Sequence, residues 1–96
     1  MSYNYYVYIL TNYYRNVLYV GVTNDLIRRI LQHKSGQGGA FTRKYRVHIL
    51  VHYEATTDIF GALEREKEIK GWSRAKKDLL INTLNPFRED LLPMIM

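Results

Sequence analysis

The chain has 96 residues, of which 47% are hydrophobic and 24% charged, and its formal net charge is +5 at pH 7. This length allows one modest hydrophobic core, and the composition is that of a folded chain rather than a disordered one. The absence of cysteine excludes disulfides and thiolate zinc sites, and no apolar run approaches the roughly 20 residues that cross a bilayer. Because no signal peptide is recognisable either, we expect one cytoplasmic domain over residues 1–96, with its core at about 4–91.

The N-terminal part predicts a β-hairpin. Two β-rich runs, YYVYIL and VLYVGVT, flank the turn-prone segment TNYYRN. A four-residue loop would place Tyr8 directly opposite Tyr19. By alternation these tyrosines share an aromatic face with Gly21, whose missing side chain would let a ligand backbone approach, and the other face is aliphatic core. A tyrosine row of this kind is also the ordinary pattern of amphipathic packing.

The next segment, TNDLIRRILQHK, predicts a helix with Thr23 or Asn24 as its N-cap. At about 100° per residue, Arg29 and His33 lie together on the edge of the buried stripe, and Arg28 faces solvent. The expected buried stripe consists of Leu26, Ile27, Ile30 and Leu31.

The remaining chain predicts a loop, a third strand and two more helices. SGQGGAFTRKYR is typical of a mobile, basic loop, and VHILVHYEA of a strand. The segment from Thr56 to Trp72 predicts a helix that Thr57 or Asp58 opens and Gly71 closes. A last helix has Ser73 as its cap and stops before Pro86.

One glutamate of the second helix lies on its apolar side. Helical phase places Glu66 within the stripe, and Glu64 and Glu68 on the opposite side. A buried carboxylate is costly without a partner or ligand. A divalent cation such as Mg²⁺ is one such ligand, and an ion pair with Lys70, one turn further on, is the structural alternative. The apolar stripe consists of Ile59, Ala62, Leu63 and Ile69.

The basic residues are clustered. Six of the 14 Lys/Arg residues lie between Arg28 and Arg46, and six more between Arg65 and Lys77. Such clusters favour a polyanionic partner, nucleic acid before membrane, although a solvated basic surface explains the charge equally well. The residues that we expect to contact nucleic acid are Arg28, Lys34, Arg43, Lys44, Arg46, Lys70 and Arg74.

The remaining candidates form one set of chemically useful groups. Phosphodiester cleavage requires a cation that stabilises charge on the phosphate, a group that accepts the proton of the nucleophile, and donors that orient the scissile group. The sequence contains no P-loop, serine triad or multi-histidine cage that would provide these functions in another way. The candidate catalytic residues are Tyr8, Tyr19, Arg29, His33 and Glu66.

In these residues the chain resembles a GIY-YIG nuclease domain, and in particular its small stand-alone bacterial members of the uncharacterised type. The first tripeptide of the family corresponds to residues 6–8, Tyr-Val-Tyr, and the second to residues 19–21, Tyr-Val-Gly. The arginine of the family falls on Arg29, a histidine found in a number of relatives on His33, and the metal-binding glutamate on Glu66. The late asparagine of some relatives corresponds to Asn85, with Asn82 as the second candidate.

The resemblance implies an α+β fold in which a three-stranded antiparallel sheet is flanked by about three helices. It also implies cleavage of DNA, including branched or structured DNA, with one Mg²⁺ or Mn²⁺ ion. Glu66 would hold the metal and Arg29 would stabilise the phosphate. Tyr8 would deprotonate or position the attacking water beside Tyr19, and which tyrosine is the base stays open.

Two further interpretations remain at this stage. One is a nucleic-acid-binding module that retains the fold without useful turnover. The other is a protein-interaction adaptor whose basic loop, residues 36–46, contacts an acidic partner. Because a nuclease domain of this size is small, we also expect a protein partner that supplies specificity. Nothing in the sequence predicts a membrane partner.

Overall fold

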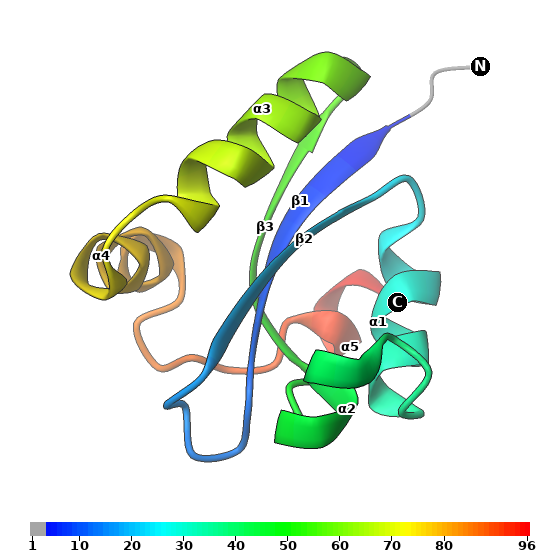
Figure 1. Ribbon diagram of the computed structural model, residues 1–96, viewed down its shortest axis with the longest axis vertical. Helices are drawn as coiled ribbons and strands as arrows, with labels where there is room; N and C mark the ends of the chain where they lie inside the picture. Colours follow the sequence, from blue (N-terminus) through cyan, green and yellow to red (C-terminus); the bar gives the residue numbers. More distant parts are fainter. Residues whose placement is uncertain (1–3) are drawn as a thin grey trace.

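The computed structural model describes residues 4–96, so the first three residues of the expected domain lie outside the described residues. Three antiparallel strands form one sheet in the order β2-β1-β3 (Figure 1). The expected α+β fold with a three-stranded antiparallel sheet is therefore confirmed, and residues 4–96 contain five helices rather than about three. The elements are β1 (Tyr5–Thr11), β2 (Leu18–Thr23), α1 (Leu26–Lys34), α2 (Ala40–Tyr45), β3 (Ile49–Thr56), α3 (Ile59–Lys70), α4 (Arg74–Leu84) and α5 (Leu92–Ile95).

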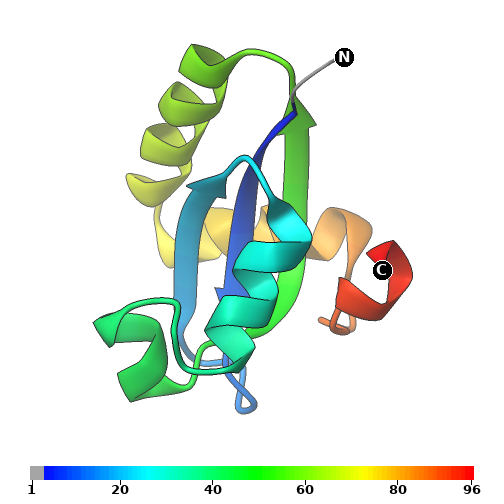
Figure 2. The ribbon, with the colours of Figure 1, turned by 90° about the vertical axis from the view of Figure 1, so that its right-hand side faces the viewer.

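Helices cover both faces of the sheet. α3 and α4 pack on one face, and α1, α2 and α5 lie on the other (Figures 1 and 2). Alternation sorts the strand side chains as expected, but the aromatic face is not open, because Tyr8 is only 1% exposed beneath these helices. The first core contains Val7, Ile9, Val20, Val51, Ala62, Ile69 and Ile81, and the second contains Tyr8, Leu10, Leu26, Ile30, Val47, Leu50 and Leu92.

The hairpin register differs from the expected one by two residues. Tyr8 pairs with Gly21, and Tyr19 pairs with Leu10. The loop has six residues instead of four, because the side-chain oxygen of Asn12 accepts hydrogen bonds from the backbone N–H groups of Asn16 (3.0 Å) and the residue after it (3.3 Å). These bonds close the loop before the ladder begins. Since a shift of two preserves alternation, every side chain remains on its expected face.

The first helix begins one residue later than expected. Asp25 is the N-cap, and its side chain accepts a hydrogen bond from the backbone N–H of Arg28 at 3.2 Å. Thr23 instead accepts a hydrogen bond from the backbone N–H of Asp25 at 3.1 Å, and so supports the cap from outside the helix.

The buried stripe of α1 also differs from the expected one. Ile27 and Leu31 are exposed, whereas His33 is buried with Leu26 and Ile30. The helix therefore contacts the sheet along a narrow line of residues spaced by three and four positions. An apolar pattern alone could not reveal that a histidine completes this line.

The glycine-rich segment is more ordered than the sequence predicts. Residues Ala40–Tyr45 form the short helix α2, with Thr42 buried beneath it. Arg46 closes this helix in the left-handed region, with φ of 54°. The expectation of a mobile loop is therefore wrong for α2.

The later helices begin and end close to their expected positions. Asp58 caps α3, and Ser73 caps α4, each through a hydrogen bond from a backbone N–H to its side chain. Gly71 follows α3 as expected, although its φ of −80° is right-handed. None of the helices within residues 4–96 has the length and apolarity that a membrane crossing needs.

Candidate active site

The ring of Tyr8 fills the space above Gly21. A Cβ atom added to Gly21 would lie 2.4 Å from both Cζ and the hydroxyl oxygen of Tyr8, which is closer than atoms can approach. The glycine is therefore required by its cross-strand partner. The expectation that the gap at Gly21 admits a ligand backbone is wrong, because Tyr8 occupies it.

Two α1 side chains share the Tyr8 hydroxyl. It lies 3.0 Å from Nε2 of His33, and Nε of Arg29 donates a hydrogen bond to it at 3.4 Å. The guanidinium of Arg29 is also held by the carbonyl of Gly38 at 3.0 Å and the side chain of Gln32 at 3.2 Å. Arg29 and His33 thus lie together as their spacing of four predicts.

His33 is neutral at physiological pH. Burial, together with the positive charge of Arg29, lowers its pKa to about 4. Nδ1 lies 3.0 Å from Oγ1 of Thr42, which in turn donates a hydrogen bond to the carbonyl of Gly39 at 3.4 Å. This network assigns the proton to Nδ1, so that Nε2 accepts the hydroxyl proton of Tyr8.

The protein also keeps Tyr8 neutral. Burial raises the pKa of its hydroxyl, and the nearby Tyr19 and Glu66 add to this effect, while Arg29 opposes it through its hydrogen bond and charge. Burial has the largest influence, and the net pKa lies above the usual value of 10.0. The groups of the protein alone therefore do not prepare Tyr8 as a base.

Tyr19 is the more accessible tyrosine of the pair. Its ring centroid lies 6.4 Å from that of Tyr8 and 5.7 Å from that of His33. Within residues 4–96 its hydroxyl has no hydrogen-bond partner, and it is not among the buried unpartnered atoms of that range. The Tyr19 hydroxyl is therefore open to solvent.

Glu66 lies on α3, in the helical layer that covers the opposite face of the sheet. Its side chain is 18% exposed against 55% for Glu68, as helical phase predicts. Oε1 forms an ion pair with Nζ of Lys70 at 3.0 Å, which is the structural alternative that the sequence left open. The charge of Glu66 is the smallest of the causes that raise the pKa of Tyr8.

The donor set fits a loosely held divalent cation rather than an all-protein cage. No group of three or more His, Asp or Glu side chains that could hold a metal occurs within residues 4–96. Mg²⁺ commonly binds through one or two carboxylates, with water and substrate oxygens completing its coordination. Glu66 could serve in this way, provided that Lys70 releases Oε1.

The expected nucleic-acid contacts separate into two groups. Arg28, Arg43, Lys44 and Arg46 are exposed, and none forms an ion pair within residues 4–96. Lys34 pairs with Asp90 at 2.6 Å and Lys70 with Glu66 at 3.0 Å. Arg74 pairs with Asp78 at 3.1 Å and donates hydrogen bonds to the carbonyls of Asn16 and Arg15 at 2.9 and 3.0 Å.

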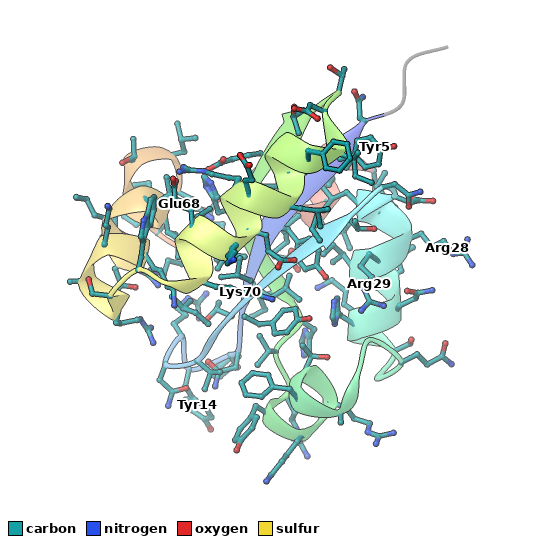
Figure 3. All side chains as sticks on the ribbon, turned by 45° about the horizontal axis from the view of Figure 1, so that its top comes forward. Tyr5, Tyr14, Arg28, Arg29, Glu68 and Lys70 are labelled. Atoms are coloured by element: carbon teal, nitrogen blue, oxygen red, sulfur yellow. The ribbon has the colours of Figure 1, made fainter. Side chains whose placement is uncertain are left out.

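Arg28 and Arg29 also differ in direction. Arg29 lies on the side of α1 toward β2, and Arg28 points away from the body of the molecule; Lys70 lies near β2 on α3 (Figure 3). A shallow pocket of about 180 Å³ borders both arginines, so Arg29 retains an open side. The other residues lining this pocket are Thr23, Asn24, Asp25 and Gln32.

Asn85 is not brought to the site. It is buried, and its side-chain nitrogen donates hydrogen bonds to the carbonyls of Val51 at 3.1 Å and Glu89 at 2.9 Å. It therefore fastens the end of α4 to β3, the edge strand opposite β2. Asn82 accepts a hydrogen bond from Arg88 at 3.4 Å and likewise belongs to this region.

Sequence reasoning missed three residues that hold the site together. Thr42 and Gln32 orient His33 and Arg29, respectively. Gly38 lies against the imidazole, because an added Cβ would be 2.0 Å from Nδ1 of His33. The glycine-rich composition of 36–39 was the available signal, although it predicts mobility as readily as close packing.

The structure thus brings Arg29 and His33 to the Tyr8 hydroxyl on one face of the sheet and leaves Glu66 on a helix of the other face. Residues 4–79 match the family model described as "GIY-YIG catalytic domain". The chain belongs to this family, a family of nucleases, which confirms the resemblance seen in its two tripeptides.

Similar proteins are of comparable length. The chain is 37% identical over 88 residues to a UPF0213 protein of Bacillus pumilus, covering 92% of this chain and 89% of that protein. It is 44% identical over 89 residues to a UPF0213 protein of Syntrophus aciditrophicus, covering 92% and 99%. The solution NMR structure of the UPF0213 protein BH0048 from Bacillus halodurans aligns with a TM-score of 0.57 at 36% identity, covering 91% and 92%.

Proposed function

We propose that the chain is an endonuclease that hydrolyses phosphodiester bonds of DNA with one bound Mg²⁺ or Mn²⁺. The observation that carries the proposal is the convergence of Arg29 and His33 on the Tyr8 hydroxyl. Membership in a nuclease family and the net charge of +5 support a nucleic-acid substrate.

Each side chain of the site has a distinct role in this proposal. Arg29 turns from the Tyr8 hydroxyl toward the scissile phosphate and stabilises its developing charge. That movement releases the Tyr8 hydroxyl from its hydrogen bond with Arg29. Tyr19, whose hydroxyl has no protein partner within residues 4–96, orients the attacking water.

His33 is a positioning residue in this proposal. Its neutral Nε2 accepts a hydrogen bond from the Tyr8 hydroxyl at 3.0 Å and so fixes the direction of that O–H bond, while its pKa of about 4 makes it a poor acceptor of a transferred proton. A divalent cation at Glu66, when bound, supplies charge stabilisation at the phosphate and lowers the pKa of water. Because burial raises the pKa of Tyr8 in the protein alone, a role of Tyr8 as base requires such added positive charge.

The test is a nuclease assay on nicked, branched and single-stranded DNA with Mg²⁺ or Mn²⁺. Glu66→Gln preserves the shape of the side chain and removes its charge, and we expect cleavage to fall by about 100-fold or more. Glu64→Gln, on the exposed side of the same helix, is the matched control and should retain wild-type cleavage. Equal background cleavage by wild type and Glu66→Gln would contradict the proposal.

A nucleic-acid-binding module without turnover is the second candidate. The observation that favours it is the ion pair between Glu66 and Lys70, which occupies the carboxylate at 3.0 Å. Salt-dependent DNA binding without metal-dependent cleavage on any of the three substrates would establish this candidate instead.

A further inference from the structure

A ladder of aromatic rings leads from the site to the surface of α2. The ring of Phe41 stacks on Tyr19, with centroids 6.0 Å apart and planes at 28°, and Tyr45 packs against Phe41 at 4.8 Å. Phe41 and Tyr45 remain 46% and 43% exposed. α2 projects from the rest of the molecule at the lower left of Figure 2.

The segment that contains these rings is basic. Between Asp25 and Glu54 the sequence contains six Lys/Arg residues and no acidic residue. Three of the six, Arg43, Lys44 and Arg46, lie on or directly after α2, and Nζ of Lys44 lies 5.3 Å from the centre of the Tyr45 ring. Two exposed rings among cations match the combination that binds a nucleic-acid strand through base faces and phosphates.

The backbone of Arg46 supports a role for its side chain. Its φ of 54° is in the left-handed region, where glycine or asparagine is favoured. Its side chain is exposed and makes no hydrogen bond or ion pair within residues 4–96. The Arg46 side chain, which has no hydrogen-bond or ion-pair partner within residues 4–96, is therefore available to a ligand.

We infer that Phe41 and Tyr45 form a stacking site for an unpaired nucleobase, with Arg43, Lys44 and Arg46 contacting the adjoining phosphates. This rests on the proposed function and names its substrate class. Inside a duplex both faces of a base are covered by neighbouring bases, so only an unpaired nucleotide offers a face to the rings. Because Phe41 stacks on Tyr19 of the site, the unpaired base lies beside the scissile phosphate. Single-stranded DNA and RNA share this chemistry.

Binding in EDTA separates this site from cleavage. Fluorescence anisotropy would compare a single-stranded DNA 20-mer, the blunt duplex of the same sequence and the corresponding RNA 20-mer. One 2-aminopurine in the single strand reports stacking directly through quenching. We expect the single-stranded DNA to bind more tightly than the duplex and the 2-aminopurine fluorescence to be quenched. The single-stranded RNA either binds as the single-stranded DNA does or binds more weakly, and this result decides whether the site accepts both nucleic acids or DNA alone.

The variants isolate the aromatic faces. Phe41→Leu and Tyr45→Leu keep apolar packing but remove the rings, and each should weaken single-strand binding by about five-fold or more. Phe41→Trp should retain binding and quenching, and it keeps the test informative if the leucine variant is unstable. Phe60→Leu, which removes a 74% exposed ring at the start of α3, is the matched control and should bind like wild type.

Equal affinity for single strand and duplex, or wild-type binding and quenching by both leucine variants, would overturn the inference. Glu66-dependent cleavage in that case would leave the nuclease proposal standing. Conversely, ring-dependent quenching without Glu66-dependent cleavage would remove the nuclease proposal and retain the stacking site.

Discussion

At the scale of single residues, Tyr8 belongs both to the hydrophobic core and to the proposed chemistry. Its ring packs against Gly21, and its hydroxyl holds His33 and Arg29 in one geometry. Because the ring is buried between strand and helix, it has no free direction in which to move. Any change that displaces the ring should therefore reduce stability and activity together.

Gly21→Ala tests this coupling. The added Cβ would meet Tyr8 at 2.4 Å, so we expect a loss of about 1–3 kcal/mol in the free energy of unfolding and a large loss of cleavage. Urea denaturation and the nuclease assay measure the two effects. Gly71→Ala is the control, because its nearest contact is an ordinary 3.5 Å and its φ is −80°, and it should be neutral or slightly stabilising. Wild-type stability of Gly21→Ala would show that Tyr8 has room to move.

The lowered pKa of His33 predicts a pH-dependent stability. Unfolding restores the pKa to about 6.5 from about 4, so the unfolded chain binds the additional proton as the pH falls through this window. Stability should therefore decline with falling pH, by about 2 kcal/mol between pH 7 and pH 5.

Urea denaturation of wild type and His33→Gln at several pH values measures this contribution. The variant should be less stable at pH 7 but should lack most of the decline above pH 5. Three carboxyls also have lowered pKa values and make stability fall with pH, but they do so in both proteins and at lower pH than His33. They are Glu54, Asp78 and Asp90. Parallel curves for the two proteins would show that His33 does not titrate in this way.

At the scale of elements, local chemistry was sufficient for much of the fold and for part of the site. Side-chain caps and apolar periodicity predicted α3, α4 and the strands, because these signals act within a few residues. Helical spacing likewise predicted that Arg29 and His33 lie on the same side of α1, and that Glu66 is less exposed than Glu68.

The failures at this scale have long-range or irregular causes. The register of the hairpin depends on the side chain of Asn12, which accepts hydrogen bonds from the loop backbone and so gives a longer loop than expected. The helix α2 forms where Phe41 packs on Tyr19, a contact that no local pattern in a glycine-rich segment predicts. Burial of Tyr8 similarly depends on helices from distant parts of the chain.

The left-handed end of α2 provides a prediction for this element. Arg46→Gly relieves the strain at φ 54°, and since glycine also has more freedom in the unfolded chain, the net gain should be about 0.5–1 kcal/mol in the free energy of unfolding. The same change should weaken nucleic-acid binding by removing a phosphate contact.

Arg15→Gly is the comparison for Arg46→Gly. Arg15 is also left-handed, with φ of 57°, but its side chain donates hydrogen bonds to the carbonyls of Tyr13 and Arg88. Thermal denaturation should show a smaller gain or a loss for Arg15→Gly. A loss of stability in Arg46→Gly would mean that its side chain contributes to the fold.

At the scale of the whole molecule, the residues of the proposed site come from the two helical layers on opposite faces of the sheet. Tyr8, Arg29 and His33 belong to the layer of α1, and Glu66 belongs to that of α3. Sequence periodicity placed each residue on a face of its own strand or helix. Which helices cover which face of the sheet follows only from the strand order and the packing, which periodicity does not give. The sequence also could not decide whether Lys70 or a cation holds Glu66.

The same scale explains which cations should bind nucleic acid. Arg43 is exposed, with no ion pair within residues 4–96, whereas Arg74 is tied to Asp78 and to the hairpin backbone. Arg43→Gln should therefore weaken single-strand binding and reduce the slope of log K against log salt by about 0.7, without changing stability. Arg74→Gln should leave that slope unchanged and cost about 1 kcal/mol in the free energy of unfolding, because the clamp between α4 and the hairpin loop is lost.

Salt titrations of binding and urea denaturation of both variants measure these effects. Similar slopes for wild type and Arg43→Gln, together with a reduced slope for Arg74→Gln, would place the nucleic acid on the α4 side of the molecule. The proposed path along α2 requires the opposite result, because the unpaired cations and the exposed rings occupy the same short helix. Charge that the fold has not already neutralised thus identifies the binding surface better than the count of basic residues does.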